Sequence, residues 1–174
     1  ISRTHFPKKK IIQTNLIENL RYGENPHQES ANYSQKSNLK KKKIHWKQLS
    51  YNNYNDIFSA LNISKSLPKN RGVVIVKHAN PCGVSILKDN INCYQAALAC
   101  DPTSAFGGIV SCNFKINSKV ASELNKIFLE VVIANGFEKK ALGILKSRKN
   151  LRLIDSSKFT LNEPFKFNSM NDSV

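Results

Sequence analysis

Short apolar runs alternate with helical periodicities from about residue 53 onward, and this alternation is the main structural signal in the chain. Ile57, Ala60 and Leu61 recur at the spacing of one helix face, and Pro68 and Gly72 end that segment. The sequence predicts further helices around 94–98 (ending near 100), 120–128 and 138–146, and strands at 73–76, 108–112, 131–134 and 151–154. Strands that alternate with helices of about 10 residues predict an α/β layer with helices on the faces of a largely parallel sheet.

Composition divides the chain into three parts. Residues 1–50 are polar and irregular, with one alternating segment near 10–16, and residues 51–155 carry the α/β pattern. The tail 156–174 is polar and lacks periodicity, so we expect it to lead toward a second subdomain. The chain begins with Ile1, which suggests a processed chain, an engineered one or an incomplete reading frame.

Apolar runs and cysteines indicate the compartment. No run approaches the roughly 20 residues of a membrane span, and no secretory signal is recognisable. The four cysteines, Cys82, Cys93, Cys100 and Cys112, form no CxxC pair. Because Cys100 and Cys112 lie in or beside apolar runs, we expect buried free thiols in a reducing cytoplasm.

The formal net charge of +15 allows a second class of function. Lysine runs at 8–10 and 40–43 could contact the phosphates of a nucleic acid. The alternative is a solvated lysine-rich surface, which we favour because the runs lack interleaved aromatic residues and no nucleic-acid-binding motif accompanies them.

The segment 73–83, VVIVKHANPCG, is the densest candidate for chemistry. Four β-branched residues predict a strand buried on both faces, and Lys77 and His78 follow at its carboxyl end. Ligands of open α/β sheets bind at the carboxyl ends of strands, and we expect a turn at Asn80-Pro81 there. The alternative is a strand that simply ends at the surface with two polar residues.

Three further motifs could converge on a ligand. LRYGENPHQ at 20–28 is a turn-rich loop in which Arg21 suits a phosphate or carboxylate, unless it forms an ordinary ion pair. LSYNNYND at 49–56 places amides at a helix start, where they either cap the helix or face a ligand. DPTSAFGGIV at 101–110 offers backbone N–H groups at Gly107-Gly108, or is only a turn before a strand.

Together these motifs resemble the AICAR transformylase domain of the bifunctional AICAR transformylase/IMP cyclohydrolase family. The resemblance is collinear and continues through FLEVVIA at 128–134 and LKSRKNLRLI at 145–154. It implies formyl transfer from 10-formyltetrahydrofolate to the 5-amino group of AICAR, in de novo purine biosynthesis. It also implies a three-layer, cytidine-deaminase-like α/β subdomain. The zinc ligands of the deaminases are absent from the corresponding positions, so we expect no catalytic metal.

The resemblance also implies roles for individual residues. His78 would act as the general base on the amine, and Lys77 would stabilise the oxyanion or protonate the departing folate nitrogen. Arg21 and Tyr22 would hold AICAR, with Arg21 on its phosphate. The remaining positions that match the nucleotide pocket are Asn53, Phe106, Gly107 and Glu130. We interpret His27, in the same motif as Arg21, as structural.

One departure from the family pattern and the extent of the chain affect these expectations. Asn135 replaces a proline, which we expect to loosen one turn. The resemblance also implies that a cyclohydrolase domain and a second transformylase half are to be expected outside these 174 residues, and that the active site forms across a homodimer interface. We therefore expect little turnover from this chain alone. A degenerate paralogue that serves subunit assembly is a further alternative, against which the retained Lys77-His78 pair argues.

Overall fold

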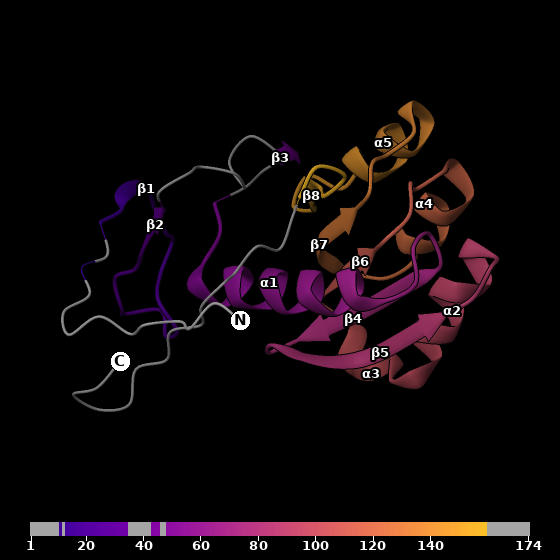
Figure 1. Cartoon of the computed structure of the whole chain (residues 1–174), viewed down its shortest axis with the longest axis horizontal. Helices are drawn as coiled ribbons and strands as arrows, with labels where there is room; N and C mark the ends of the chain where they lie inside the picture. The colour runs from indigo at the N-terminus through magenta and orange to yellow at the C-terminus, as the bar shows by residue number, and fades with distance from the viewer. Residues whose placement is uncertain (1–10, 12, 35–42, 46–47, 160–174) are drawn as a thin grey trace, which may run out of the picture.

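A six-stranded mixed sheet with strand order β3-β8-β7-β6-β4-β5 forms the centre of the computed structural model, which describes residues 11, 13–34, 43–45 and 48–159 (Figure 1). A separate two-stranded sheet pairs β1 with β2. The strands are β1 (Asn15–Asn19), β2 (Ala31–Ser34), β3 (Lys43–His45), β4 (Gly72–Lys77), β5 (Asn80–Ile86), β6 (Gly108–Cys112), β7 (Leu129–Ala134) and β8 (Arg152–Asp155). The helices are α1 (Tyr51–Ser66), α2 (Asn90–Cys100), α3 (Pro102–Ala105), α4 (Ser118–Leu124) and α5 (Lys139–Lys146).

The sheet combines two kinds of pairing. β6, β7 and β8 run parallel to one another, as the alternation of strands and helices predicts. β4 runs antiparallel to both of its neighbours, β5 and β6, and β3 runs antiparallel to β8. The sequence analysis missed β5, whose Pro81 and Gly83 obscure the strand pattern. The α/β class is confirmed, and the parallel region is confined to three strands.

Helices cover both faces of the sheet, which gives the three layers implied by the resemblance. α1 packs on one face, where Ile57 and Leu61 share a core with Val74, Val76 and Ile109. The opposite face packs against α2, α4 and α5, and its core contains the alternate strand residues. Val73–Val76 are therefore all fully buried, as predicted, because successive side chains of β4 enter opposite cores.

Most predicted boundaries agree with the structure, and α4 is the main exception. Asn117 caps α4, accepting a hydrogen bond from the backbone N–H of Val120 (3.0 Å). The helix ends at Leu124 rather than near Phe128, because the chain turns at Asn125 and β7 begins at Leu129. Phe128 is consequently exposed outside the helix.

The turn at Asn135 is firmly held, so the expectation that asparagine loosens it is wrong. The Asn135 amide nitrogen donates to the backbone oxygen of Asn113 (2.6 Å). Its oxygen accepts from Lys65 Nζ and from the Ser156 hydroxyl, each at 3.0 Å. The backbone N–H of Asn135 also donates to the oxygen of Phe114 (3.2 Å), a bond that proline could not make.

The cysteines and the N-terminal segment complete the comparison. All four cysteines are free thiols, with Cys93 and Cys112 buried, but Cys100 is exposed and its predicted burial is wrong.

β3 lies within the predicted segment 1–50 yet pairs with β8 of the central sheet. The lysine runs 8–10 and 40–42 and the tail from 160 lie outside the described residues. None of the described helices is both long and apolar enough to cross a bilayer.

Candidate functional site

The Lys77-His78 pair lies at a tight hairpin turn between β4 and β5. Lys77 pairs with Asn80, so His78 and Ala79 form the two-residue turn, and the predicted turn at Asn80-Pro81 is wrong because these residues begin β5. The φ angles of His78 and Ala79 are 52° and 60°. Such a turn needs positive φ at both central residues, a conformation that glycine adopts freely, that asparagine, aspartate and histidine tolerate, and that other residues rarely adopt. The candidate catalytic histidine therefore precedes Ala79, whose backbone is the more strained of the two.

Two side chains of α1 hold this turn. The backbone N–H of Ala79 donates to Asp56 Oδ1 (2.6 Å), and the Ser59 hydroxyl donates to the backbone oxygen of Ala79 (2.7 Å). Burial raises the pKa of the Asp56 carboxyl, while the Ala79 N–H and the nearby His78 act in the opposite direction. Asp56 is therefore attached to the turn through the residue that follows His78.

Lys77 reaches sideways along the sheet edge toward the double-glycine turn. Its ammonium donates to the backbone oxygen of Phe106 (2.5 Å). Gly107, at φ +71°, lies directly beside it, since a Cβ there would be 3.0 Å from Lys77 Nζ. Phe106 and Phe128 are exposed and pack against each other with ring centroids 5.4 Å apart. The structure thus brings an ammonium, a glycine turn and two aromatic rings together.

Strand directions explain why these residues meet. Val76 pairs with Ile109, Gly108 with Leu129, and Val131 with Arg152. Because β4 is antiparallel to β6, its carboxyl end lies beside the amino ends of the parallel strands β6, β7 and β8. The Lys77-His78 pair is at the carboxyl end of its own strand, as predicted, but the parallel strands contribute their amino ends to this place rather than their carboxyl ends.

Glu130 occupies the same edge and links two elements. Asn53 donates from its amide nitrogen to Glu130 Oε2 (2.7 Å), and Arg152 approaches the same oxygen at 3.9 Å. Asn53 also completes a capping box with Ser50 at the start of α1, so both predicted uses of this asparagine occur together. Burial lowers the pKa of the Arg152 guanidinium, Glu130 opposes that shift, and Arg21 adds to it.

The loop 20–28 is attached to the start of α1. The backbone N–H of Arg21 donates to Leu49 O (2.9 Å), and that of Tyr51 donates to Tyr22 O (3.1 Å). Arg21 folds over its neighbour, donating to the Tyr22 hydroxyl at 2.6 Å. An open hollow of about 630 Å³ lies between this loop and the β1–β2 hairpin; its lining includes Arg21, His27, Gln28 and Tyr33.

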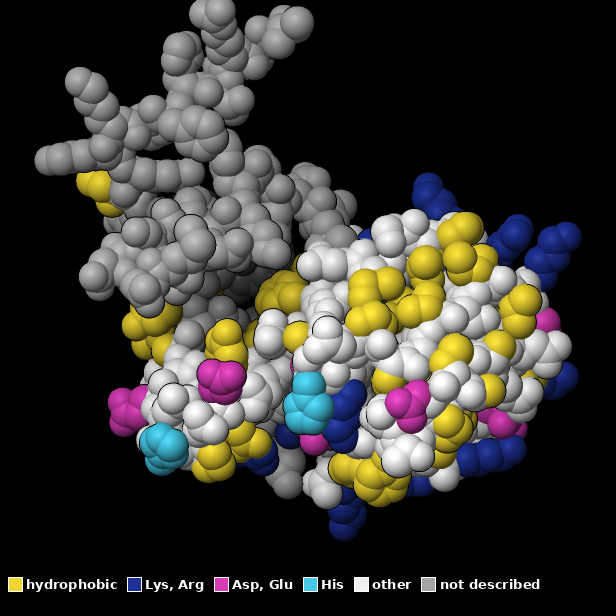
Figure 2. All heavy atoms as spheres, turned by 90° about the horizontal axis from the view of Figure 1, so that it is seen from below, with side chains coloured by type: hydrophobic (Ala, Val, Ile, Leu, Met, Phe, Trp, Pro, Cys, Tyr) yellow, Lys and Arg dark blue, Asp and Glu magenta, His cyan; other side chains and the backbone are white. Residues whose placement is uncertain are grey.

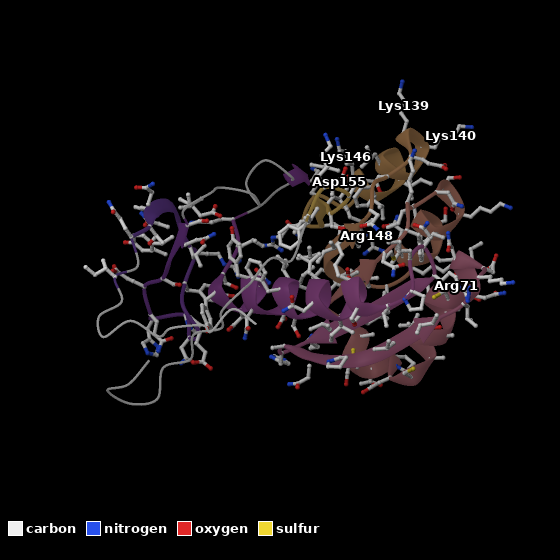
Figure 3. The ribbon with its side chains drawn as sticks, viewed as in Figure 1. Arg71, Lys139, Lys140, Lys146, Arg148 and Asp155 are labelled. Carbon is white, nitrogen blue, oxygen red and sulfur yellow. The ribbon has the colours of Figure 1, made fainter. Side chains whose placement is uncertain are left out.

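The predicted residues lie in three groups rather than in one enclosed pocket. Lys77, Phe106 and Gly107 meet beside the His78 turn, and Asn53 and Glu130 meet beside Arg152. Arg21 and Tyr22 lie in the loop that is bonded to the start of α1. Figure 2 views the molecule from the side on which β5 lies, where hydrophobic side chains gather among scattered charged ones. The lysines of α5, Lys139, Lys140 and Lys146, project into solvent elsewhere (Figure 3).

The sequence analysis missed four residues of this edge: Asp56, Ser59, Phe128 and Arg152. Asp56 ends the amide-rich motif three positions after Asn53, so helical spacing places it on the same face of α1. Phe128 and Arg152 lie in the stretches 128–134 and 145–154 that carry the resemblance, but their place beside the other residues depends on strand order. The described part of the chain contains no group of three His, Cys, Asp or Glu residues arranged to hold a metal ion.

Comparisons with known proteins agree on one family. The model of the family described as AICARFT/IMPCHase bienzyme matches residues 1–174. The bifunctional purine biosynthesis protein PurH of Oceanobacillus iheyensis is 41% identical over 155 residues, covering 86% of this chain and 30% of the relative. The protein of the same name from Acetivibrio thermocellus is 43% identical over 159 residues, covering 88% and 31%.

A solved structure is more distantly similar. Acinetobacter baumannii RibD, form 1, matches with a TM-score of 0.44 and 17% identity over 59% of this chain and 35% of its own. The chain spans about 30% of the length of the curated relatives that it matches. The family model nevertheless matches all 174 residues of this chain, which shows that the chain belongs to the AICARFT/IMPCHase bienzyme family.

Proposed function

We propose that this chain forms the AICAR-binding part of a formyltransferase site in de novo purine biosynthesis. The observation that carries the proposal is the juxtaposition at the end of β4. The Lys77 ammonium, the His78 turn and the Gly107 turn share one sheet edge with Asn53 and Glu130. An ammonium and an imidazole on a partly exposed edge are suited to assist the attack of a substrate amine on a formyl carbon.

The reaction joins an amine to an acyl carbon. The 5-amino group of AICAR attacks the formyl carbon of 10-formyltetrahydrofolate, and the C–N10 bond of the folate breaks as the new C–N bond forms. His78 accepts the proton that the amine loses. Lys77 stabilises the oxyanion of the tetrahedral intermediate or supplies the proton to the departing folate nitrogen, which leaves as tetrahydrofolate.

The other residues of the edge bind the nucleotide. Arg21 is suited to the phosphate because its guanidinium is exposed beside an open hollow and offers several parallel donors. The Asn53–Glu130 pair presents an amide and a carboxylate to the polar groups of the imidazole carboxamide. The Phe106 ring and the backbone at Gly107 border the space beside Lys77.

The folate contacts come largely from polypeptide beyond this chain. The edge described above is open, and the chain spans about 30% of its curated relatives. We propose that the full site needs a second transformylase half and a homodimer partner, in the cytoplasm. The isolated chain should then bind AICAR but transfer formyl groups poorly, so robust turnover by the chain alone would contradict this part of the proposal.

Substitution of the pair tests the catalytic assignment. In a full-length bienzyme that contains this segment, Lys77→Ala and His78→Ala should each lower kcat for formyl transfer by about 10²-fold or more, the range of general acid–base effects. IMP cyclohydrolase activity of the same preparations should not change. Lys139→Ala, an exposed lysine of α5, is the matched control. Unchanged formyl transfer in both variants would remove the assignment, and a selective loss of cyclohydrolase activity would reassign the site.

Binding measurements separate this proposal from the nucleic-acid alternative. The enzyme proposal predicts saturable AICAR binding to the 174-residue chain that Arg21→Ala weakens strongly. A nucleic-acid-binding module would instead bind generic DNA or RNA tightly, with an affinity that falls steeply as salt rises. A paralogue that serves only subunit assembly would bind neither AICAR nor nucleic acid.

A further inference from the structure

We propose that Asp56 is a positioning residue that holds the His78–Ala79 turn in its left-handed conformation and thereby aims the His78 imidazole at the substrate. The inference rests on the proposed formyl transfer for its kinetic consequence. Its structural part, the clamp on the turn, can be tested independently of any activity.

The turn needs an external clamp because its own residues disfavour it. His78 and Ala79 both have positive φ, at 52° and 60°. The Cβ of an L residue is crowded in this conformation, and two consecutive residues carry the cost here. Asn80 Nδ2 donates to the His78 oxygen at 2.9 Å, which is one local support. Backbone strain of this kind persists only where surrounding contacts fix it.

α1 supplies those contacts from one face. Asp56 Oδ1 accepts the Ala79 N–H at 2.6 Å, and the Ser59 hydroxyl donates to the Ala79 oxygen at 2.7 Å. The two side chains are three positions apart and therefore lie on the same side of the helix. Together they bind the N–H and the C=O of a single turn residue, so Ala79 is held from both ends.

The clamp is rigid because its helix is anchored. Ile57, next to Asp56, is fully buried against the sheet, and Ala60 and Leu61 are buried with it. Asn53, one turn earlier, fixes the same helix to Glu130 of β7. One helix therefore sets the position of the catalytic turn relative to the nucleotide-binding edge.

The acceptor, rather than the charge, is the part of Asp56 that the clamp requires. A bond of 2.6 Å from an N–H to a carboxylate oxygen is short and directional. An asparagine side chain of the same length can present an oxygen at the same place. An alanine cannot, and it leaves the Ala79 N–H without this acceptor.

The test compares Asp56→Ala, Asp56→Asn and the double variant Asp56→Ala/Ala79→Gly in a full-length bienzyme that contains this segment. Asp56→Ala should lower kcat for formyl transfer by about 10²-fold, with little change in the KM for AICAR, because a displaced catalytic group reduces the rate rather than binding. Asp56→Asn should retain kcat within about threefold, since the acceptor remains. Glycine adopts positive φ without steric cost, so Ala79→Gly should restore kcat about tenfold in the Asp56→Ala background.

These results separate positioning from general structural damage. If Asp56 mattered only for folding, Ala79→Gly would not restore kcat, and the loss would follow the melting temperature. Failure of Asp56→Asn together with no rescue by glycine would overturn the proposal in favour of a role for the charge. Wild-type kcat in Asp56→Ala would overturn it outright.

Hydrogen exchange tests the clamp without reference to activity. The Ala79 amide should exchange slowly in the wild-type protein and in Asp56→Asn, and markedly faster in Asp56→Ala. Equal exchange in all three would refute the clamp. If the exchange pattern appears but Lys77→Ala and His78→Ala leave formyl transfer intact, the proposed function fails and the clamp stands.

Discussion

Gly107→Ala is the substitution that most directly tests how Lys77 is held. Gly107 has a φ of +71°, and its missing side chain makes room for the ammonium of Lys77. A Cβ at this position would lie 3.0 Å from Lys77 Nζ and 3.5 Å from the nearest atom of Phe128. The ring contact is ordinary van der Waals packing, whereas the ammonium must move by a few tenths of an ångström. The Lys77 hydrogen bond to Phe106 O would then lengthen.

The structure separates the expected cost to stability from the expected cost to activity. An alanine in the left-handed region costs about 1–2 kcal/mol, and the end of a flexible lysine can shift at little further cost. For a chain of this size, 1 kcal/mol lowers Tm by about 2–4 °C. Catalysis is more sensitive, because a displacement of about 1 Å can cost about 10²-fold in rate. We expect Gly107→Ala to lower formyl-transfer kcat by about tenfold.

The assay measures Tm and kcat on the same preparations, with Gly143→Ala as the matched control. Gly143 lies in α5, is exposed, and a Cβ there would meet nothing within 4 Å. Its replacement should leave kcat unchanged and raise stability by about 0.5–1 kcal/mol, the usual gain in a helix. Wild-type kcat in Gly107→Ala would refute the argument that this glycine positions the ammonium. A loss of kcat in Gly143→Ala of similar size would show that the assay reports stability alone.

Three further predictions concern packing, hydrogen bonding and titration. Gly83→Ala should destabilise the chain by at least about 3 kcal/mol in chemical denaturation, because its Cβ would lie 2.0 Å from the backbone oxygen of Ala97 and a helix backbone cannot yield; a loss under about 1 kcal/mol would contradict this. Asn135→Ala should cost about 2–3 kcal/mol, since three side-chain hydrogen bonds are lost; a neutral result would mean that solvent replaces them. Burial raises the pKa of Asp56 above its ordinary 3.8, so the folded state binds this proton more tightly than the unfolded state. The free energy of unfolding therefore falls as pH rises from the ordinary pKa through the raised one, where the buried carboxyl ionises. The stability of Asp56→Asn relative to wild type, followed by thermal denaturation against pH, should therefore increase from about pH 4 upward, and a constant difference would refute the burial argument.

The sequence located the residues of the candidate site better than it located their surroundings. Asn53 was identified from a motif before a helix, and the structure shows that it caps α1 and contacts Glu130 in the same conformation. Asp56 lay in the same motif without being recognised. Its partner is the backbone N–H of Ala79, and a main-chain group leaves no trace in the composition of a motif.

The antiparallel course of β4 is a second case in which the sequence was insufficient. The sequence of a strand that ends in Lys77-His78 does not indicate whether its neighbours run parallel or antiparallel to it. The β5 strand itself was obscured by Pro81 and Gly83. The pairing of β4 with β6 places the end of one strand beside the starts of the next three. The edge at which the site lies therefore depends on non-local pairing.

Local chemistry along the chain was enough to predict the longer helices and the buried strands β4, β6, β7 and β8, since β-branched runs, caps and periodic apolar positions act over a few residues. It was also enough, through the spacing of four motifs, to place the chain in its family. Only the tertiary structure decided that His78 and Ala79 would adopt positive φ and that α1 would hold them there. The physical reason is that a strained turn is stabilised by groups 20 and 23 positions away, whose approach depends on how the helix packs across the sheet.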